Sequence, residues 1–306
     1  MAEKKIQTKR IKRNINGVLL LDKPLGFTSN QALQKVKWLF SAAKAGHTGT
    51  LDPLATGLLP ICLGEATKFA QYVTDADKTY IATIKLGVTT STGDAEGEVL
   101  TTAPVNVSQS QFAATCQQFM GEISQVPPMY SALKFEGRAL YSYAREGVDI
   151  ARQSRLIHIS HISVDNFNVD MAQITVVCSK GTYIRTLAED IGAALGSGAH
   201  LIGLRRTETA GYLLPNAVTI EQLENLSIEA REALLLPVDS AIESLPKVVL
   251  NADAAYFMMQ GQAVWQAGKI ADSELRLYDE QNNFLGLGFL QDDGKIAPKR
   301  LIQKST

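Results

Sequence analysis

Residues 45–64 read AGHTGTLDPLATGLLPICLG, a stretch rich in glycine and threonine that holds one histidine and one aspartate and then becomes apolar. A phosphate-binding P-loop needs Lys and Ser or Thr after its last glycine, whereas Gly57 is followed by Leu-Leu-Pro, so that motif is excluded. A metal site is also excluded, because His47 and Asp52 have no third ligand at a recognisable spacing. His158 and His161 are three apart in a predicted strand, so we expect their side chains on opposite faces.

Two roles for Asp52 remain open at this point. Aspartate followed by proline is a good helix N-cap, because the carboxylate accepts a hydrogen bond from the first turn and the proline lacks only an N–H that would have no partner. Local chemistry favours this structural role. The other role is that of a catalytic carboxylate, which the local sequence alone does not establish.

The composition is that of a globular protein with a substantial core. The chain has 306 residues, 45% of them hydrophobic and 20% charged, which is enough for one large domain and a small one. No apolar run approaches the roughly 20 residues that cross a bilayer. The first residues are basic and lack the apolar region of a secretory signal.

Cysteine usage and charge narrow the setting of the protein. Cys62, Cys116 and Cys178 are widely spaced and form no C-x-x-C pair, so we predict neither disulfides nor a zinc knuckle and expect a cytoplasmic location. The net charge of −1 leaves the partner open, although acidic residues gather at 221–245 and the remainder is net basic. The basic residues near the N-terminus are expected to form a solvated arm: Lys4, Lys5, Lys9, Arg10, Lys12 and Arg13.

Strand and helix patterns are mixed along the chain without the strict alternation of a doubly wound fold, so an α+β fold is favoured. Alternating or apolar runs predict strands, and runs with apolar spacing of three and four after a capping residue predict helices. Strands are predicted at 15–24, 79–90, 156–169 and 172–179, and helices at 28–40, 108–121, 182–196, 219–226 and 227–235. Beyond Pro246 short strand patterns alternate with glycine-containing turns, which indicates a domain boundary near that residue.

The stretch GHTGTLDPLATG (46–57) resembles the signature of the tRNA pseudouridine-55 synthases. Further segments resemble motifs of this family in the family's order: GVLLLDKPLGFTS (17–29), KTYIATIKLGVTTSTGDAEGEV (78–99), VPPMYSALKFEGRALYSYAREGV (126–148), CSKGTYIRTLAEDIG (178–192) and LRRTETAGY (204–212).

The resemblance implies an α+β domain of the pseudouridine-synthase type over residues 1–245, with a mixed sheet, flanking helices and a tRNA-clasping loop at about 124–150. A small β-rich module similar to a PUA domain is expected at 246–306. The implied reaction is isomerisation of uridine-55 in the T loop of tRNA to pseudouridine, which needs no cofactor and no metal. The implied partner is tRNA, bound by a cytoplasmic monomer that requires no protein partner and no membrane.

The resemblance also assigns the catalytic residues. The aspartate matching Asp52 is the essential residue of the family, and it either attacks the sugar carbon as a nucleophile or removes the 2′ proton; both routes stay open. Arg185, at the start of a predicted helix, is the candidate ion-pair partner, because a nearby cation favours the charged carboxylate. Without the resemblance Arg185 would be interpreted as a surface ion-pair residue. Tyr183 is implied to carry a proton beside the base.

Three further residues are implied to contact the substrate. Tyr80 would stack on the flipped uracil, Leu204 would line the opposite wall of the base pocket, and His47 would help to hold the opened loop of the tRNA. The sequence alone would place Tyr80 and Leu204 in the core and His47 in an ordinary loop.

Basic and aromatic residues interleave in the segment that resembles the tRNA-clasping loop. Lys134, Arg138 and Arg145 are predicted to bind RNA there; the alternative is an ordinary amphipathic hairpin or helix. A different functional class also stays open, a tRNA-folding chaperone whose binding and elbow opening is the main activity. Asp52 together with its Arg and Tyr partners favours the enzyme.

Overall fold

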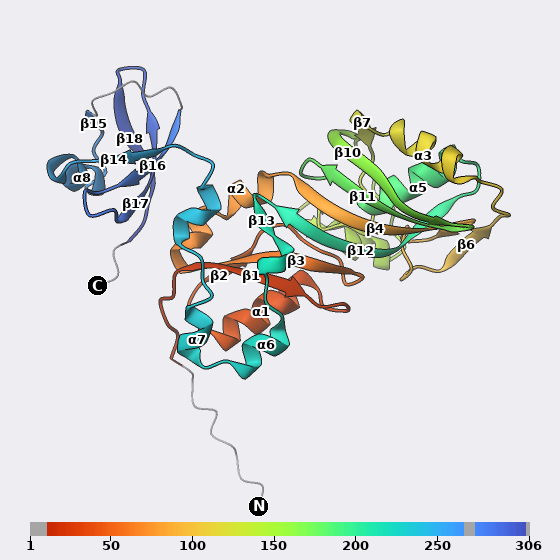
Figure 1. Cartoon of the computed structure of the whole chain (residues 1–306), viewed down its shortest axis with the longest axis horizontal. Helices are drawn as coiled ribbons and strands as arrows, with labels where there is room; N and C mark the ends of the chain where they lie inside the picture. Colours follow the sequence, from red (N-terminus) through yellow and green to blue (C-terminus); the bar gives the residue numbers. More distant parts are fainter. Residues whose placement is uncertain (1–10, 266–272, 304–306) are drawn as a thin grey trace, which may run out of the picture.

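The computed structural model describes residues 11–265 and 273–303, which form a large part around a nine-stranded sheet and a small part around a five-stranded sheet (Figure 1). Most of the predicted N-terminal arm, namely Lys4, Lys5, Lys9 and Arg10, lies outside the described residues. Arg13 is described, and it forms an ion pair with Glu232 at 2.5 Å.

The large sheet has the order β1-β3-β12-β4-β11-β10-β7, with β2 paired to β3 and β13 paired to β12. Its pairs are antiparallel except β12 with β3, so the sheet is mixed and the α+β prediction is confirmed. The strands are β1 (Gly17–Lys23), β2 (Ala45–His47), β3 (Ala55–Leu63), β4 (Lys78–Leu86), β7 (Gly121–Gln125), β10 (Arg155–Asn168), β11 (Met171–Cys178), β12 (Ala199–Thr209) and β13 (Tyr212–Leu213).

Strand β3 shows that the predicted N-cap at Asp52 is wrong. No helix follows this residue; the N–H of Ala55 bonds the carbonyl of Asp52 in a turn, and β3 begins at Ala55. The apolar run of β3 is buried along almost its whole length because the strand lies between β1 and β12. Pairing on both sides therefore overrides the local capping signal.

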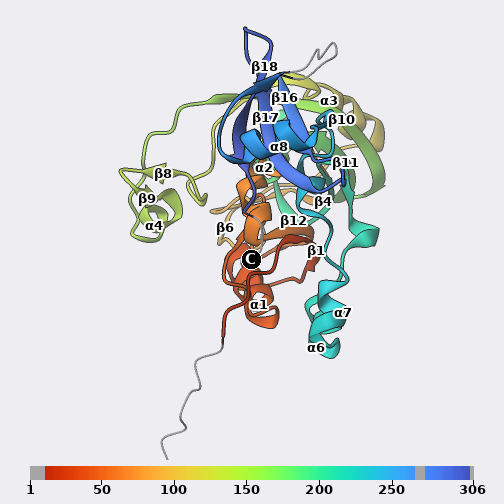
Figure 2. The same ribbon diagram turned by 90° about the vertical axis from the view of Figure 1, so that its left-hand side faces the viewer.

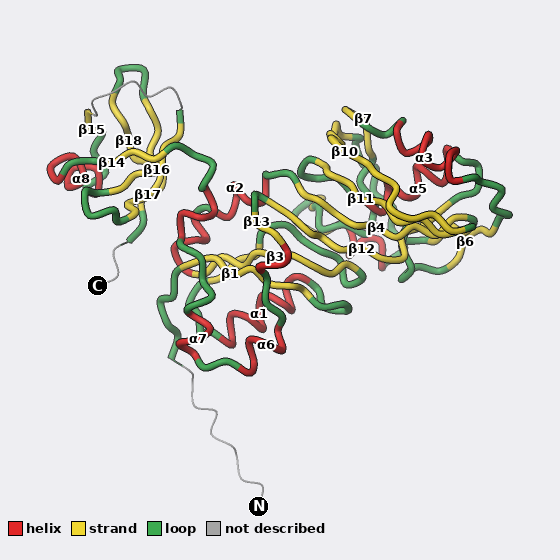
Figure 3. The backbone as a smooth tube through the Cα atoms, in the orientation of Figure 1, coloured by secondary structure: helices red, strands yellow, loops and turns green. Residues whose placement is uncertain are grey.

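Helices cover the large sheet at two places (Figure 1, Figure 3). Helices α3 (Gln109–Gln117) and α5 (Ile184–Ala194) lie together at the β10–β11 end, and α1 (Ser29–Leu39) lies below β1 and β3 beside α6 (Ile220–Asn225) and α7 (Ile228–Glu232). Thr28 and Ser108 are the N-cap residues of α1 and α3, each in a complete capping box, so the predicted capping residues before these helices are confirmed. The segment between β4 and α3 contains β5 (Val88–Thr90) and β6 (Val99–Thr102).

A small subdomain stands away from the body of the large part (Figure 2). It consists of the hairpin β8 (Lys134–Phe135) and β9 (Arg138–Ala139) followed by helix α4 (Leu140–Arg145). This is the segment predicted to clasp tRNA.

The small sheet has the order β14-β16-β17-β18-β15 and follows Pro246. Its elements are β14 (Lys247–Val249), α8 (Ala252–Met259), β15 (Val264–Trp265), β16 (Glu274–Tyr278), β17 (Phe284–Leu290) and β18 (Lys295–Leu301). The prediction of short strands missed α8, which begins at the N-cap Asn251 and buries Ala254, Ala255 and Met258. That this part acts as a separate RNA-binding domain stays a prediction.

The small part docks on η1 (Gly64–Lys68) and α2 (Ala70–Asp75). Lys68 bonds both Glu65 and the carbonyl of Leu301, and the hydroxyl of Tyr72 donates to Glu274 at 2.7 Å. An edge-on contact of Phe69 with Phe284, with ring centroids 5.6 Å apart, adds apolar burial to these polar contacts.

Candidate active site

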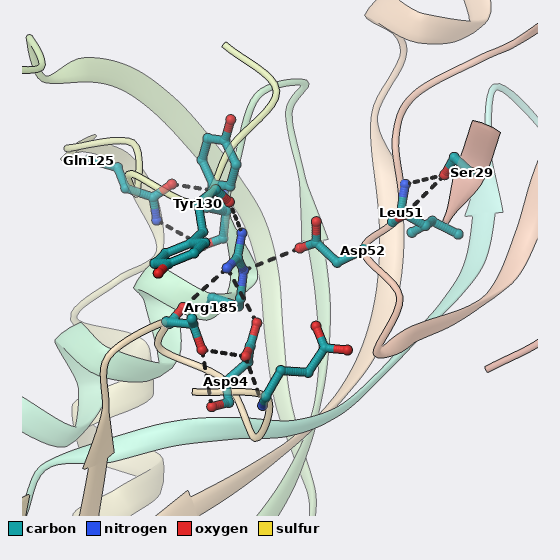
Figure 4. A network of polar contacts seen from close by, with 10 residues as sticks. Ser29, Leu51, Asp52, Asp94, Gln125, Tyr130 and Arg185 are labelled. Carbon is teal, nitrogen blue, oxygen red and sulfur yellow. Dashed lines mark hydrogen bonds and ion pairs between the residues drawn. The ribbon is translucent and has the colours of Figure 1, made fainter. Parts of the chain in front are cut away.

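Asp52 lies in the loop between β2 and β3, and neighbouring residues hold that loop in place. The hydroxyl of Ser29 bonds both the carbonyl and the N–H of Leu51 (Figure 4), and the N–H of Gly26 bonds the carbonyl of Pro53. The loop is thus fixed on both sides of Asp52, while the Asp52 side chain stays 40% exposed.

Arg185 lies in the first turn of α5, as predicted, and is 4% exposed. Its Nε lies 3.2 Å from Oδ2 of Asp52, so the structure brings the predicted pair together (Figure 4). The same guanidinium donates to the carbonyls of Thr92 and Tyr130 at 3.1 and 2.6 Å and lies 3.3 Å from Oδ2 of Asp94. Four partners fix one plane of the guanidinium, which aims Nε at Asp52.

Asp94 is the residue that the sequence analysis missed. It is 2% exposed, and its Oδ1 accepts hydrogen bonds from the hydroxyl of Thr92 at 2.5 Å and from the N–H of Glu96 at 3.0 Å. The signal available in the sequence was its place in the motif segment STGDAEGEV, where an acidic residue among small residues is also typical of a solvated turn.

The electrostatics of Asp52 reflect opposing causes. Burial raises the pKa of its carboxyl above the ordinary value, Arg185 lowers it, and Asp94 raises it. Lys23 adds a smaller lowering effect from inside the protein, where it is buried and donates to the carbonyl of Pro24. Arg185 therefore supplies the main stabilisation of the charged carboxylate.

Two cavities meet at Asp52. One of about 450 Å³ is lined by His47, Tyr141 and Arg145, and the other, of about 580 Å³, is lined by Tyr80 and Leu204 among others. Both cavities are lined by Asp52 and Arg185 and by the segment 131–132. A larger cavity of about 790 Å³ lies against the small sheet and contains none of the predicted site residues.

The predicted base-contact residues surround the second cavity. Tyr80 lies on β4 and is 8% exposed, and Leu204 lies on the neighbouring strand β12 and is partly buried. Tyr183 is the N-cap residue of α5; its N–H donates to Oε1 of Gln125 at 2.8 Å, and Arg155 lies 5.0 Å above its ring. Their roles toward a substrate stay predictions.

His47 lies on β2 and lines the first cavity only. Burial lowers the pKa of its imidazole, and the nearby Arg206 lowers it further. Its Nδ1 is buried without a hydrogen-bond partner among the described residues. A neutral imidazole at a cavity wall suits stacking or hydrogen bonding better than attraction of phosphate.

The three predicted RNA-binding residues differ in their positions. Lys134 and Arg138 are exposed on the β8–β9 hairpin, where Arg138 pairs with Glu146 and lies 4.7 Å above the ring of Tyr143. Arg145, at the end of α4, lies 5.5 Å above the ring of Tyr141 and reaches the first cavity. Arg145 therefore lines a cavity that Asp52 also lines, whereas Lys134 and Arg138 do not.

Residues 11–265 and 273–303 bear on the predictions about metal sites, strand faces and membrane spans. Within these residues no group of three or more His, Cys, Asp or Glu side chains could hold a metal ion. The expectation that His158 and His161 point to opposite faces is wrong, because an irregularity of β10 between Ile159 and His161 leaves both exposed. The same part of the chain contains no helix long and apolar enough to span a membrane.

Models of known protein families match three consecutive segments of the chain. The model of the TruB family pseudouridylate synthase N-terminal domain matches residues 37–184, that of the tRNA pseudouridylate synthase B C-terminal domain matches 185–243, and that of the pseudouridine synthase II TruB C-terminal domain matches 246–302.

Curated relatives match over nearly their whole length. The tRNA pseudouridine synthase B of Methylobacillus flagellatus is 60% identical, with 98% of this chain and 99% of the relative covered. The tRNA pseudouridine synthase B of Stutzerimonas stutzeri is 52% identical, with 97% and 99% covered.

Solved structures share the fold. A chain in the crystal structure of a Cbf5-Nop10-Gar1 complex superposes with a TM-score of 0.69 at 28% identity, covering 94% of this chain and 84% of that one. A chain in an H/ACA RNP bound to a substrate RNA containing 2′-deoxyuridine gives a TM-score of 0.69 at 24% identity, covering 94% and 85%.

Proposed function

The chain belongs to the TruB family of pseudouridylate synthases, and from this premise we propose that it isomerises uridine-55 in the T loop of tRNA to pseudouridine. The observation that carries the proposal is the Asp52–Arg185 pair at the junction of two cavities. A flipped nucleotide needs such a junction, because its base enters a pocket while its sugar and phosphates stay outside.

The reaction breaks the C1′–N1 bond, turns the uracil and joins its C5 to C1′. The sugar carbon therefore has to lie beside Asp52, with the base in the cavity of Tyr80 and Leu204. Asp52 then attacks C1′ as a nucleophile or removes the 2′ proton. Arg185 keeps the carboxylate charged and aimed at the sugar.

The remaining residues serve binding and proton transfer in this proposal. Tyr80 stacks on the uracil and Leu204 covers its other face, while Tyr183 passes the proton that C5 releases to water, and N1 takes up a proton from water in exchange. His47 and Arg145 hold the opened T loop in the first cavity, and Lys134 and Arg138 contact phosphates farther along the strand. We place the C-terminal part on the tRNA as a further binding module and regard a monomer in the cytoplasm as the working form.

The test is Asp52→Asn, a nearly isosteric change. Folding, measured by the melting curve, and tRNA affinity, measured by filter binding, are expected to survive. Single-turnover tritium release from tRNA carrying 5-tritiated uridine is expected to vanish, because an amide replaces neither a nucleophile nor a base. The matched control is Asp75→Asn, since Asp75 lines the base cavity but pairs with Lys180 on its rim.

Three outcomes would count against the proposal. Turnover of Asp52→Asn within about tenfold of the parent, a barrier change of about 1.4 kcal/mol, removes the catalytic assignment. A tRNA in which cytidine replaces uridine-55 is expected to gain no pseudouridine in carbodiimide mapping; pseudouridine elsewhere would refute the position. Tight tRNA binding by a parent protein without turnover would favour the chaperone.

A further inference from the structure

Arg206 is buried in the middle of the large sheet. It is 1% exposed and is the largest fully buried side chain of the described residues. On β12 its backbone lies opposite Gly57 of β3 on one side and Tyr80 of β4 on the other. An arginine at such a place needs a reason, because a buried guanidinium is costly unless its donors find partners.

Arg206 joins three elements of the site. Its Nε donates to the carbonyl of Leu58 on β3 at 2.7 Å, and its Nη2 donates to the carbonyl of Gly49, in the loop of Asp52, at 3.3 Å. Its backbone pairs with that of Tyr80 on β4. Backbone carbonyl oxygens meet the charge of Arg206, whereas the adjacent Arg205 is 41% exposed and pairs with Asp22 at 2.7 Å.

Two glycines of the stretch 45–64 make room for Arg206. Gly57 has φ +98°, and a Cβ there would lie 2.3 Å from the carbonyl oxygen of Arg206. Gly49 has φ +82°, and a Cβ there would lie 3.3 Å from Nη1 of Arg206. Gly46, in the same stretch, has nothing within 4 Å of such an atom. Two of the four glycines of this stretch, Gly49 and Gly57, are therefore required by its close approach to Arg206.

We propose that Arg206 is a positioning residue that ties the Asp52 loop to Tyr80. The loop is fixed at Leu51 by Ser29 and at Gly49 by Arg206, so the carboxylate keeps a constant position relative to the base cavity. The inference rests on the proposed function, because a fixed distance between Asp52 and Tyr80 matters only when a uridine bridges them.

The planar fork of the guanidinium, rather than its charge, performs this task. Lysine carries the same charge as a compact point with rotatable donors and lacks the planar fork that bonds the carbonyls of Leu58 and Gly49 together. The charge of Arg206 can be followed separately through the pKa of His47, which burial lowers and Arg206 lowers further. Substitution by lysine and by methionine therefore separates geometry from charge.

The experiment compares Arg206→Lys and Arg206→Met with the control Arg205→Met. We expect both Arg206 variants to bind tRNA within about threefold of the parent, while their single-turnover rate falls about 100-fold, the usual effect of misplacing a catalytic group by an ångström. The pKa of His47, followed by NMR titration, is expected to rise in Arg206→Met and to stay low in Arg206→Lys. Arg205→Met should match the parent throughout.

A second pair of variants approaches the same contact from the loop. Gly49→Ala places a methyl group against Nη1, whereas the control Gly121→Ala, at a similarly positive φ of +87°, places one in open space. We expect the rate to fall in the first variant only, and this pair decides the matter if the Arg206 variants do not fold. Full rescue by Arg206→Lys, or a Gly49→Ala rate within about threefold of the parent, would overturn the proposal. Absence of turnover in the parent and in Arg205→Met would instead overturn the proposed function.

Discussion

Asp94→Asn tests whether the buried carboxylate behind Arg185 aims the guanidinium at Asp52. The change is nearly isosteric, and its remaining oxygen can still accept the bonds from Thr92 and Glu96. What it removes is the oxygen that faces Nη1 of Arg185 at 3.3 Å, where an NH2 group or an uncharged oxygen would stand instead.

The magnitude follows from burial and distance. The side chains of Arg185 and Asp94 are 5% and 2% exposed and lie 3.3 Å apart, so at an effective dielectric constant of about 20 their attraction is about 5 kcal/mol. Desolvation offsets part of this, and breaking a buried pair usually costs about 3–5 kcal/mol. Asp52 and two carbonyls still accept hydrogen bonds from Arg185 in the variant. We therefore expect the free energy of unfolding to fall by about 3 kcal/mol, the lower end of that range. The melting temperature should then fall by about 5–10 °C.

The pH dependence of the rate provides a second test of Asp94→Asn, because the substitution also changes the pKa of Asp52. The charge of Asp94 raises the pKa of Asp52, so its removal lowers that pKa toward the ordinary value. In the proposed reaction Asp52 must be ionised, so activity is lost as the pH falls through its pKa. Because Asp52 and two carbonyls still hold Arg185, the acid limb of the rate profile is expected to move to lower pH, while the plateau falls about 100-fold because the guanidinium is less firmly aimed.

The assay is single-turnover tritium release from acid to neutral pH, with melting curves recorded in parallel. Asp190→Asn is the matched control, because Asp190 lies half-buried on α5, where burial alone raises its pKa. An Asp94→Asn plateau within about threefold of the parent, or an acid limb displaced to higher pH, would refute the reasoning.

Two predictions concern the segment 134–145 and the C-terminal part as RNA-binding regions. Replacing Lys134, Arg138 and Arg145 together by alanine should flatten the dependence of tRNA affinity on salt concentration, measured by filter binding; an unchanged slope would assign these residues to packing. Deleting residues 246–306 should raise KM for tRNA more than it lowers kcat, and it should lower the melting temperature because Phe69 loses its contact with Phe284. Loss of kcat at constant KM would mean that the C-terminal part shapes the active site.

Local sequence signals predicted the elements of the fold where local interactions decide them. Thr28 and Ser108 cap their helices through contacts three residues away, and β4 alternates between buried and half-buried residues along its length. The turn at Asp52 and Pro53 carries an equally good capping signal, yet a strand follows. Its partners β1 and β12 lie far away in the chain, and no local signal reports them.

Some residues of the candidate site could likewise be predicted from the sequence and others could not. The resemblance pointed to Asp52 and Arg185, and the geometry joins them. Asp94 was missed because its partner Arg185 lies 91 residues away in the chain. Arg205 and Arg206 cannot be distinguished by residue type; only the alternation of β12 turns one toward solvent and Asp22 and the other into the sheet.

Long-range contacts determine the roles of the glycines and the aspartate in the stretch 45–64. A glycine-rich segment with one aspartate is compatible with a phosphate loop, a cap or a catalytic loop as long as its neighbours are unknown. In the fold, Gly57 lets β3 pass against the backbone of Arg206, and Gly49 lets the loop approach its guanidinium. Asp52 follows three residues after Gly49 and pairs with Arg185 in the first turn of α5. Gly49 and Gly57 are therefore needed for close packing around Arg206, and Asp52 is the residue of this stretch to which we assign the chemistry.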